Sequence, residues 1–146
     1  MEASDFMAGD WVYNSKNERC KICSIEGIGE PYATLDNYDK ENDGCFETEC
    51  DLNPIPLVAD ILEKNGFVHR QSVTWGDVFT YTYAIVQKDK VLQYEQHFNL
   101  SPNPYDGSGF YWIPEMSAVS ALRVVYVHEL QHLLRLCGIE KDIIEL

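Results

Sequence analysis

The chain has 146 residues, of which 24 are acidic and 11 are Lys or Arg, giving a formal net charge of −13 at pH 7. A surface of this sign repels the phosphates of nucleic acids and of anionic membranes, because binding them requires a basic footprint. We therefore expect no direct nucleic-acid binding and no membrane partner. An apolar content of 45% is sufficient for the core of one domain or of two small ones.

Two further features indicate the compartment. Residues 1–5 are acidic where a secretory signal peptide would be basic, and no apolar run approaches the roughly 20 residues that cross a bilayer. The five cysteines are an odd number, which does not suggest a closed disulfide framework. These features predict a protein of the reducing cytoplasm.

The first third of the chain has the pattern of short strands separated by polar turns. The predicted strands cover residues 11–13, 19–25, 31–35 and 45–50, with a polar turn at 36–44. Several short strands of this kind favour a small barrel over a helical unit. We therefore predict that residues 1–54 form a small N-terminal β-barrel of the SH3-like kind.

The sequence Asn53-Pro54-Ile55-Pro56 ends this pattern, because proline lacks a backbone donor and restricts the residue before it. A short helix is predicted at 57–64, with Asn65-Gly66 as a left-handed stop. The remaining predicted elements are strands at 67–72, 78–87, 91–98, 110–112 and 121–125, a tight hairpin at 88–90, a loop at 101–109, and a helix at 127–137 ended by Gly138. The predicted fold class is α+β, in which the barrel is followed by a domain of residues 55–146 with an antiparallel sheet and two helices.

The pentapeptide His128-Glu129-Leu130-Gln131-His132 matches the H-E-x-x-H motif of zinc metallopeptidases. In that motif two histidines one turn apart bind zinc and the glutamate activates water. The chain offers no clear third ligand, and Arg135 stands where the extended motif has glycine.

The position of these histidines on the helix also bears on the zinc hypothesis. An apolar stripe at helical spacing is formed by Leu130, Leu133, Leu134 and Cys137. This stripe is expected to be buried, which places His128 and His132 on the nearly opposite side of the helix, facing solvent. We expect no catalytic zinc and no other cofactor. A zinc-dependent hydrolase, with His128 and His132 as ligands and Glu129 as the base, is the alternative.

Cys20 and Cys23 form a C-x-x-C pair, and Cys45 and Cys50 form a second, wider pair. Four thiolates could hold a structural zinc. The strand expected around the first pair instead sends Cys20 and Cys23 to opposite faces, which favours small apolar residues over ligands. The segment 39–44 resembles the start of a calcium loop, but Cys50 occupies the place of its closing glutamate.

Aromatic side chains are dense between residues 75 and 112, where most are expected to form core and cross-strand pairs. Those of the 101–112 region could also line a pocket, and exposed aromatics beside arginine are typical of binding hot spots. The candidate ligand-binding residues are Arg70, Trp75, Tyr105, Tyr111, Trp112 and Arg123. They predict a binding surface in the 70–123 region.

Three blocks of the sequence carry a resemblance. They are Gly9-Asp10-Trp11-Val12, then 53–57 with 61–67, and finally 126–132 with 136–139. Together they resemble a family of small uncharacterised proteins from gut bacteria and their phages. The resemblance implies a phage or mobile-element accessory protein in the cytoplasm of the host cell, and it implies no zinc site.

Accessory proteins of this kind commonly counter host defence. Our hypothesis is a non-enzymatic binding protein with one of two partners: a host-derived small molecule, such as a nucleotide immune signal that it sequesters, or a host defence protein that it blocks. The alternatives are the zinc hydrolase and a phage structural or cargo component. A homo-oligomer is compatible with all of these hypotheses.

Overall fold

The computed structural model describes residues 6–27, 32–38, 44–48, 51–74, 78–88, 91, 93, 95–102, 109–113 and 122–146. Side chains are described for all of these except 44–48, 70–74, 78–81 and 113. The chain divides into two compact units, residues 1–56 with 126–128 and residues 57–125 with 129–146. Of the helices in the described part, none is long and apolar enough to cross a membrane.

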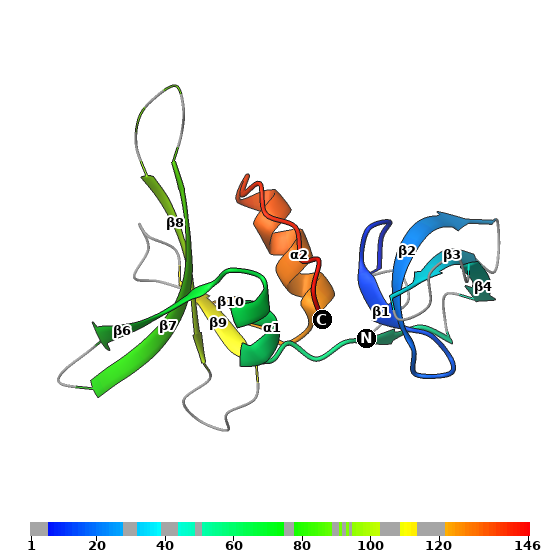
Figure 1. Ribbon diagram of the computed structural model, residues 1–146, viewed down its shortest axis with the longest axis horizontal. Helices are drawn as coiled ribbons and strands as arrows, with labels where there is room; N and C mark the ends of the chain where they lie inside the picture. Colours follow the sequence, from blue (N-terminus) through cyan, green and yellow to red (C-terminus); the bar gives the residue numbers. More distant parts are fainter. Residues whose placement is uncertain are drawn as a thin grey trace. The chain divides into compact units, whose positions relative to one another are not determined.

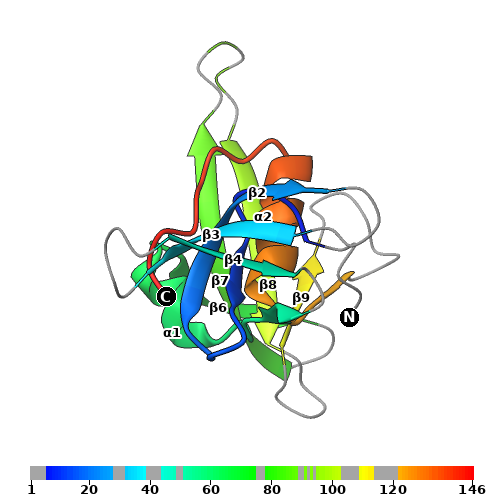
Figure 2. The same cartoon turned by 90° about the vertical axis from the view of Figure 1, so that its right-hand side faces the viewer.

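The first unit contains a five-stranded antiparallel sheet (Figures 1 and 2). Its strands are β1 (Trp11–Tyr13), β2 (Arg19–Glu26), β3 (Tyr32–Asn37), β4 (Gly44–Thr48) and β5 (Asn53–Pro54), in the order β4-β3-β2-β1-β5. The described pairings leave the sheet open between β4 and β5, so a closed SH3-like barrel stays a prediction. The four strands predicted here from the sequence are all present.

The fifth strand, Asn53–Pro54, pairs with Val12 and Tyr13 of β1 and was not predicted. Proline is tolerated there because β5 is an edge strand, where its missing donor costs no ladder bond. The core of this unit is formed by alternate residues of β1, β2 and β3 with flanking apolar residues. Its buried members are Phe6, Val12, Cys20, Ile22, Ala33, Leu35 and Leu52.

The second unit contains another five-stranded antiparallel sheet, with two helices (Figure 1). Its strands are β6 (Val68–Thr74), β7 (Val78–Lys88), β8 (Glu95–Pro102), β9 (Phe110–Ile113) and β10 (Leu122–Val124), in the order β10-β9-β8-β7-β6. The helices are α1 (Ala59–Lys64) and α2 (Val127–Leu136), and α2 begins in the first unit with Val127 and His128. Two antiparallel sheets and two helices agree with the predicted α+β class.

One face of the second sheet carries its aromatic core. Phe98 lies between Phe67, at a ring-centroid distance of 6.3 Å, and Trp112, also at 6.3 Å. Tyr83 packs edge-on against Phe110 at 5.8 Å. Tyr83, Leu100 and Trp112 are paired in register across β7, β8 and β9. Phe98 and Phe110 lie two residues along their strands from Leu100 and Trp112, so their rings project from the same face of the sheet.

The predicted position of β8 was wrong by four residues at each end. The strand begins at Glu95, which pairs with Lys88, and it continues to Pro102. The tight hairpin predicted at 88–90 is therefore wrong as well, because six residues separate the paired positions. The predicted strand began at Val91 because this residue is apolar. In the structure Val91 is 86% exposed, so it is not part of the core. The predicted loop at 101–109 starts later than expected, and its residues 103–108 lie outside the described part of the chain.

Both helices end at the glycines that the sequence indicated. Gly66 has a φ of +85° and Gly138 a φ of +71°, which are left-handed conformations that glycine adopts without a Cβ clash. After α1, Phe67 N–H donates to Leu62 C=O at 3.0 Å, and after α2, Ile139 N–H donates to Leu134 C=O at 2.9 Å. These bonds are Schellman closures, which satisfy carbonyls at the end of each helix.

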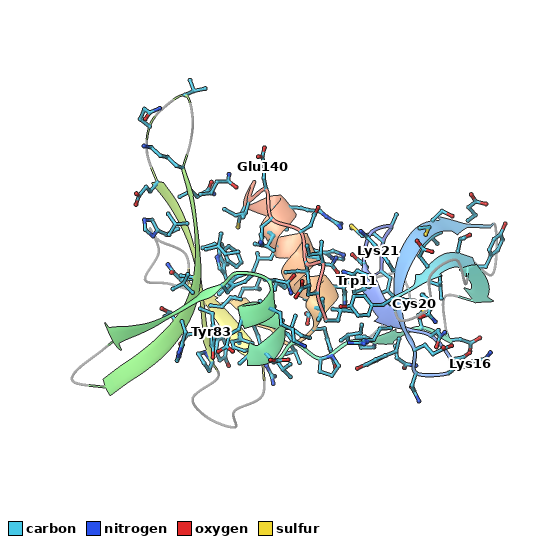
Figure 3. The ribbon with its side chains drawn as sticks, viewed as in Figure 1. Trp11, Lys16, Cys20, Lys21, Tyr83 and Glu140 are labelled. Carbon is cyan, nitrogen blue, oxygen red and sulfur yellow. The ribbon has the colours of Figure 1, made fainter. Side chains whose placement is uncertain are left out.

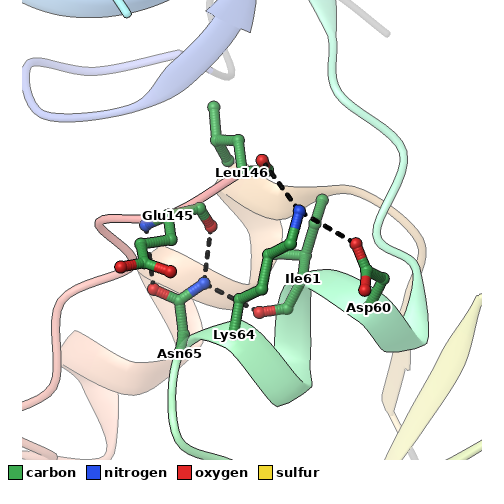
Figure 4. A network of polar contacts seen from close by, with 6 residues as sticks. All are labelled: Asp60, Ile61, Lys64, Asn65, Glu145 and Leu146. Atoms are coloured by element: carbon green, nitrogen blue, oxygen red, sulfur yellow. Dashed lines mark hydrogen bonds and ion pairs between the residues drawn. The ribbon is translucent and has the colours of Figure 1, made fainter.

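The segment after α2 is held against α1 by Asn65 (Figure 4). The Asn65 amide nitrogen donates to the carbonyls of Ile61 at 2.7 Å and Glu145 at 2.6 Å. Its oxygen accepts from the backbone N–H groups of Ile144 at 2.9 Å and Glu145 at 3.0 Å. Ile143 and Leu146 are buried beside these contacts. Asn65, which was expected only to terminate a helix, thereby supplies four of the hydrogen bonds at the end of α1, three of them to Ile144 and Glu145.

Candidate functional site

The histidines of the H-E-x-x-H segment do not share a solvent-facing side. His128 is only 1% exposed, and its ring lies 4.8 Å from Phe6 and 5.9 Å from Tyr126 between centroids. His132 is half-buried. The prediction that both face solvent is therefore wrong for His128. The physical reason is that Val127 and His128 belong to the first unit, where the Phe6 ring packs on His128. The leucines of α2 therefore do not indicate which residues are buried at its first two positions.

The glutamate of this segment serves the start of the helix. One Glu129 carboxylate oxygen accepts a hydrogen bond from the backbone N–H of Val125 at 3.2 Å. A glutamate at the third helical position commonly bonds the N–H of the residue just before the helix, whereas Glu129 bonds the N–H one residue earlier. Burial of one histidine and this hydrogen bond of the glutamate account for the geometry of the segment.

The apolar stripe of α2 is largely as predicted. Leu130, Leu133 and Leu134 are buried, whereas Cys137 is only half-buried. Burial raises the pKa of the Cys137 thiol above its ordinary value. The thiol is therefore kept in its neutral form, which is the form that a partly apolar environment favours.

The first cysteine pair is divided between the two faces of β2, as expected. Cys20 is buried and Cys23 is exposed, and a β-bulge between Ile22 and Ser24 leaves Cys23 as the extra residue. Figure 3 labels Cys20 in the first unit. Cys45 lies in β4 without a described side chain, and Cys50 and the predicted calcium-loop residues 39–43 lie outside the described residues. Among the residues that are described, no three His, Cys, Asp or Glu side chains form a metal-binding group.

Of the six candidate ligand-binding residues, Tyr111, Trp112 and Arg123 have described side chains. Tyr111 and Trp112 are adjacent in β9, so their side chains point to opposite faces of the sheet. Trp112 stacks on Phe98 within the aromatic core, while Tyr111 pairs across the strands with exposed Arg123. Arg70 lies in β6 without a described side chain, and Trp75 and Tyr105 lie outside the described residues. A surface built on Tyr111 and Arg123 stays a prediction.

The outer face of the first sheet carries two cation–π pairs that the sequence analysis missed. The Arg19 guanidinium lies 4.5 Å from the Tyr38 ring centroid, and the Lys21 ammonium lies 5.7 Å from that of Trp11. Trp11 is only 7% exposed, so little of its ring is available to a ligand. These pairs stabilise the sheet face. The register that pairs Trp11 with Lys21 would have been the signal for the second contact.

The second unit contains a groove of about 760 Å³. This volume lies within the range of about 300–1,000 Å³ that is usual for ligand sites. One side is formed by the end of β7 with Gly66 and Val68, and the other by the segment after α2. The lining residues are Gly66, Val68, Ala84, Ile85, Val86, Gln87, Lys88, Val91, Ile139, Glu140 and Lys141. Tyr111, Trp112 and Arg123, the three candidates with described side chains, are not among them.

The wall after α2 is attached to the sheet by two glutamine side chains. Gln87 Nε2 donates to the Gly138 carbonyl at 3.1 Å, and Gln87 Oε1 accepts from the Glu140 N–H at 2.7 Å. Gln96 Nε2 donates to the Cys137 carbonyl at 2.6 Å. Figure 3 labels Glu140, which follows the last turn of α2. The groove is therefore a built feature of the unit, with both walls fixed by hydrogen bonds.

The charge of the groove differs from that of the chain. Among its described lining residues are Lys88, Lys141 and one acid, Glu140, whereas the chain as a whole has 24 acids and 11 Lys and Arg. Val68 and Val86 add apolar surface, at 52% and 39% exposed. The sequence did contain a signal for this site, because the strand predicted at 78–87 is longer than its expected partner at 67–72 and must extend past it.

A second feature of this unit is the environment of Tyr83, which Figure 3 labels. Burial raises the pKa of the Tyr83 hydroxyl, and the negative charge of Glu63 raises it further. The His69 ring stacks on Tyr83 at 4.8 Å between centroids. The phenol is therefore held protonated and ring-packed, which suits a core residue.

Comparisons of the chain with protein-family models, with curated proteins and with solved structures gave no match.

Proposed function

We propose that the protein acts by binding, without catalysing a reaction, and that its partner is another protein which it engages through the groove of the second unit. The observation that carries the proposal is the groove itself: an exposed, partly apolar hollow with two lysines in a strongly acidic chain. Exposed apolar surface in a hollow rimmed by polar groups is typical of interaction sites.

The setting we propose is that of a phage or mobile-element accessory protein which blocks a host defence protein. Of the two partners considered from the sequence, the groove favours a protein over a nucleotide signal. Val68, Val86 and Ile139 give it aliphatic walls, and no aromatic side chain that would stack on a base is among its described lining residues. Two lysines opposed by Glu140 are also a weak match for a polyphosphate.

The experiment is a selection of random twelve-residue peptides from a display library on the immobilised full chain, followed by NMR titration of the labelled chain with an enriched synthetic peptide. We expect the largest amide shifts at Val68, at 84–88 and at 139–141. Arg123→Ala is the matched control, because Arg123 is exposed on the surface predicted from the sequence and outside the groove. It should leave the affinity unchanged.

Two outcomes would defeat the proposal. One is a library that yields no peptide enriched over an empty support. The other is an enriched peptide whose shifts centre on Tyr111 and Arg123 and whose binding is lost in Arg123→Ala, which would place the site on the predicted surface instead.

A further inference from the structure

The groove exposes the edge of a strand. Five consecutive residues of β7, Ala84 to Lys88, line it. Successive side chains of a strand point to opposite faces, so a groove over one face would be lined by every second residue. A run of consecutive residues is the pattern expected where a groove follows the edge of the strand.

The register of the sheet explains why this edge is open. β6 begins at Val68, which pairs with Ala84, whereas β7 continues to Lys88. On its other side β7 is paired with β8 up to Lys88 and Glu95. In the described part of the sheet, residues 85–88 thus have a strand on one side only. About half of these residues direct their N–H and C=O groups away from β8, as in any strand.

The segment 139–141 borders this edge without completing the sheet. The hydrogen bonds that join its neighbourhood to β7 come from the Gln87 side chain, to Gly138 and Glu140. Because the Gln87 side chain makes these bonds, they do not use the backbone N–H and C=O groups along the edge of β7, and a ligand can pair with those groups. Natural proteins usually cover or charge such an edge, because it is a template for another strand.

We propose that the groove accepts an extended segment of the partner protein, which adds to β7 as a further strand along residues 85–88, with alternating apolar side chains and a carboxylate at its ends. The proposal rests on the proposed function of this groove. Main-chain hydrogen bonds supply affinity in this mode of recognition, and side-chain pockets supply specificity.

The side chains of the groove define the chemistry of that segment. Val68, Ala84 and Val86 lie on one face of the sheet, since Val68 pairs with Ala84 and Val86 is two residues further along. They would pack against the apolar residues of an added strand. Lys88 and Lys141 outnumber Glu140 and attract carboxylates. The negative charge of the rest of the chain repels acidic peptides elsewhere, so a bound acidic segment is selective for this place.

The test uses three synthetic peptides with the full chain. The first is a blocked heptapeptide of alternating valine and threonine with aspartate at both ends. The second has lysine at both ends. The third is the aspartate peptide N-methylated at alternate positions, so that one of its edges cannot donate. We expect the aspartate peptide to bind about fivefold more tightly than the lysine peptide, since exposed ion pairs contribute little each. N-methylation of the pairing edge should weaken binding by about thirtyfold, as loss of two hydrogen bonds requires.

The charge-swapped variant Lys88→Glu with Lys141→Glu should reverse the order of the aspartate and lysine peptides. Neither residue is deeply buried, so the variant is expected to fold. Lys16→Glu changes an exposed lysine of the first unit in the same direction and should leave the order unchanged.

The outcomes separate this inference from the proposed function. Library peptides that bind the groove but are indifferent to N-methylation and to both lysines would overturn the added strand and leave the binding groove standing. A chain that dimerises in sedimentation experiments, with amides 85–88 protected in the dimer, would overturn the inference in favour of a second copy. If neither the heptapeptides nor any library peptide shifts amides 84–88, the inference and the proposed function both fail.

Discussion

Each unit of the protein contains an asparagine that is only 2% exposed, yet the two are satisfied in different ways. In the first unit, Asn14 Oδ1 accepts from the backbone N–H groups of Lys16 at 3.0 Å and Glu18 at 2.8 Å. In the second, Asn65 binds the backbone of Ile144 and Glu145, some 80 residues along the chain. A buried polar group must be paired in both cases. In the first unit the asparagine bonds the turn in which it lies. In the second unit the asparagine holds a segment that is distant in the sequence.

The difference has a consequence for the groove. Its second wall, residues 139–141, is held by Gln87 at Gly138 and Glu140. The residues that follow the wall, Ile144 and Glu145, are held by Asn65. Loss of Asn14 should therefore disturb a hairpin, whereas loss of Asn65 should release one wall of the proposed site. The same residue type thus has a local role in one unit and a role in site formation in the other.

The largest effect is expected for Asn65→Ala. It removes two donated and two accepted hydrogen bonds in a buried position, which should lower the free energy of unfolding by about 3 kcal/mol. Hydrogen exchange of the Ile144 and Glu145 amides should accelerate, and the affinity for groove-binding peptides should fall. Urea denaturation, exchange and peptide titration measure the three effects.

Two controls sharpen this comparison. Lys64→Ala removes an exposed ion pair with Asp60 of the same helix and a 3.4 Å hydrogen bond to the Leu146 carbonyl. It should lower the free energy of unfolding by less than about 1 kcal/mol. Asn14→Ala should cost about 1–2 kcal/mol and speed exchange at Lys16 and Glu18 alone. If Asn14→Ala weakened peptide binding as much as Asn65→Ala does, the proposed separation of roles would be wrong.

A smaller effect is expected at the start of α2, where the two histidines can be compared. His128→Ala removes a buried ring from between Phe6 and Tyr126 and should lower the free energy of unfolding by about 2 kcal/mol. His132→Ala, at a half-buried position, should cost less than about 1 kcal/mol. Thermal unfolding with added zinc should show no rise in Tm. A zinc-dependent rise in the native chain that both variants abolish would restore the metal-site hypothesis.

The sequence was sufficient where local chemistry determines the structure. Gly66 and Gly138 terminate helices because only glycine adopts their backbone conformation without strain. Cys20 and Cys23 separate because strands alternate. Reasoning from single elements failed where a second element decides the outcome. His128 is buried because Phe6, far away in sequence, packs on it, and a helical wheel contains no such information.

The groove is another feature that depends on contacts between elements distant in the sequence. Its edge could be anticipated from two strands of unequal length, but its second wall could not. That wall depends on Gln87 and Gln96 reaching the end of α2, and neither contact leaves a periodic signal in the sequence. Aromatic density pointed instead to Trp112, which is half-buried and stacks on Phe98.

The smallest expected effect is on the reactivity of the thiols, which can be measured in both units of the native chain without a substitution. Alkylation by iodoacetamide proceeds through the thiolate, and peptide mass spectrometry follows each cysteine separately. Of the two described thiols of the first unit, exposed Cys23 should react in the native protein and buried Cys20 only after unfolding. In the second, burial raises the pKa of Cys137, so less thiolate is present at a given pH than in the unfolded chain. Its rate profile should therefore lie at higher pH in the native protein and return to lower pH in urea. A native profile at the unfolded position would mean that Cys137 is fully hydrated and that the end of α2, which Gln96 holds through the Cys137 carbonyl, is not packed against the sheet as described.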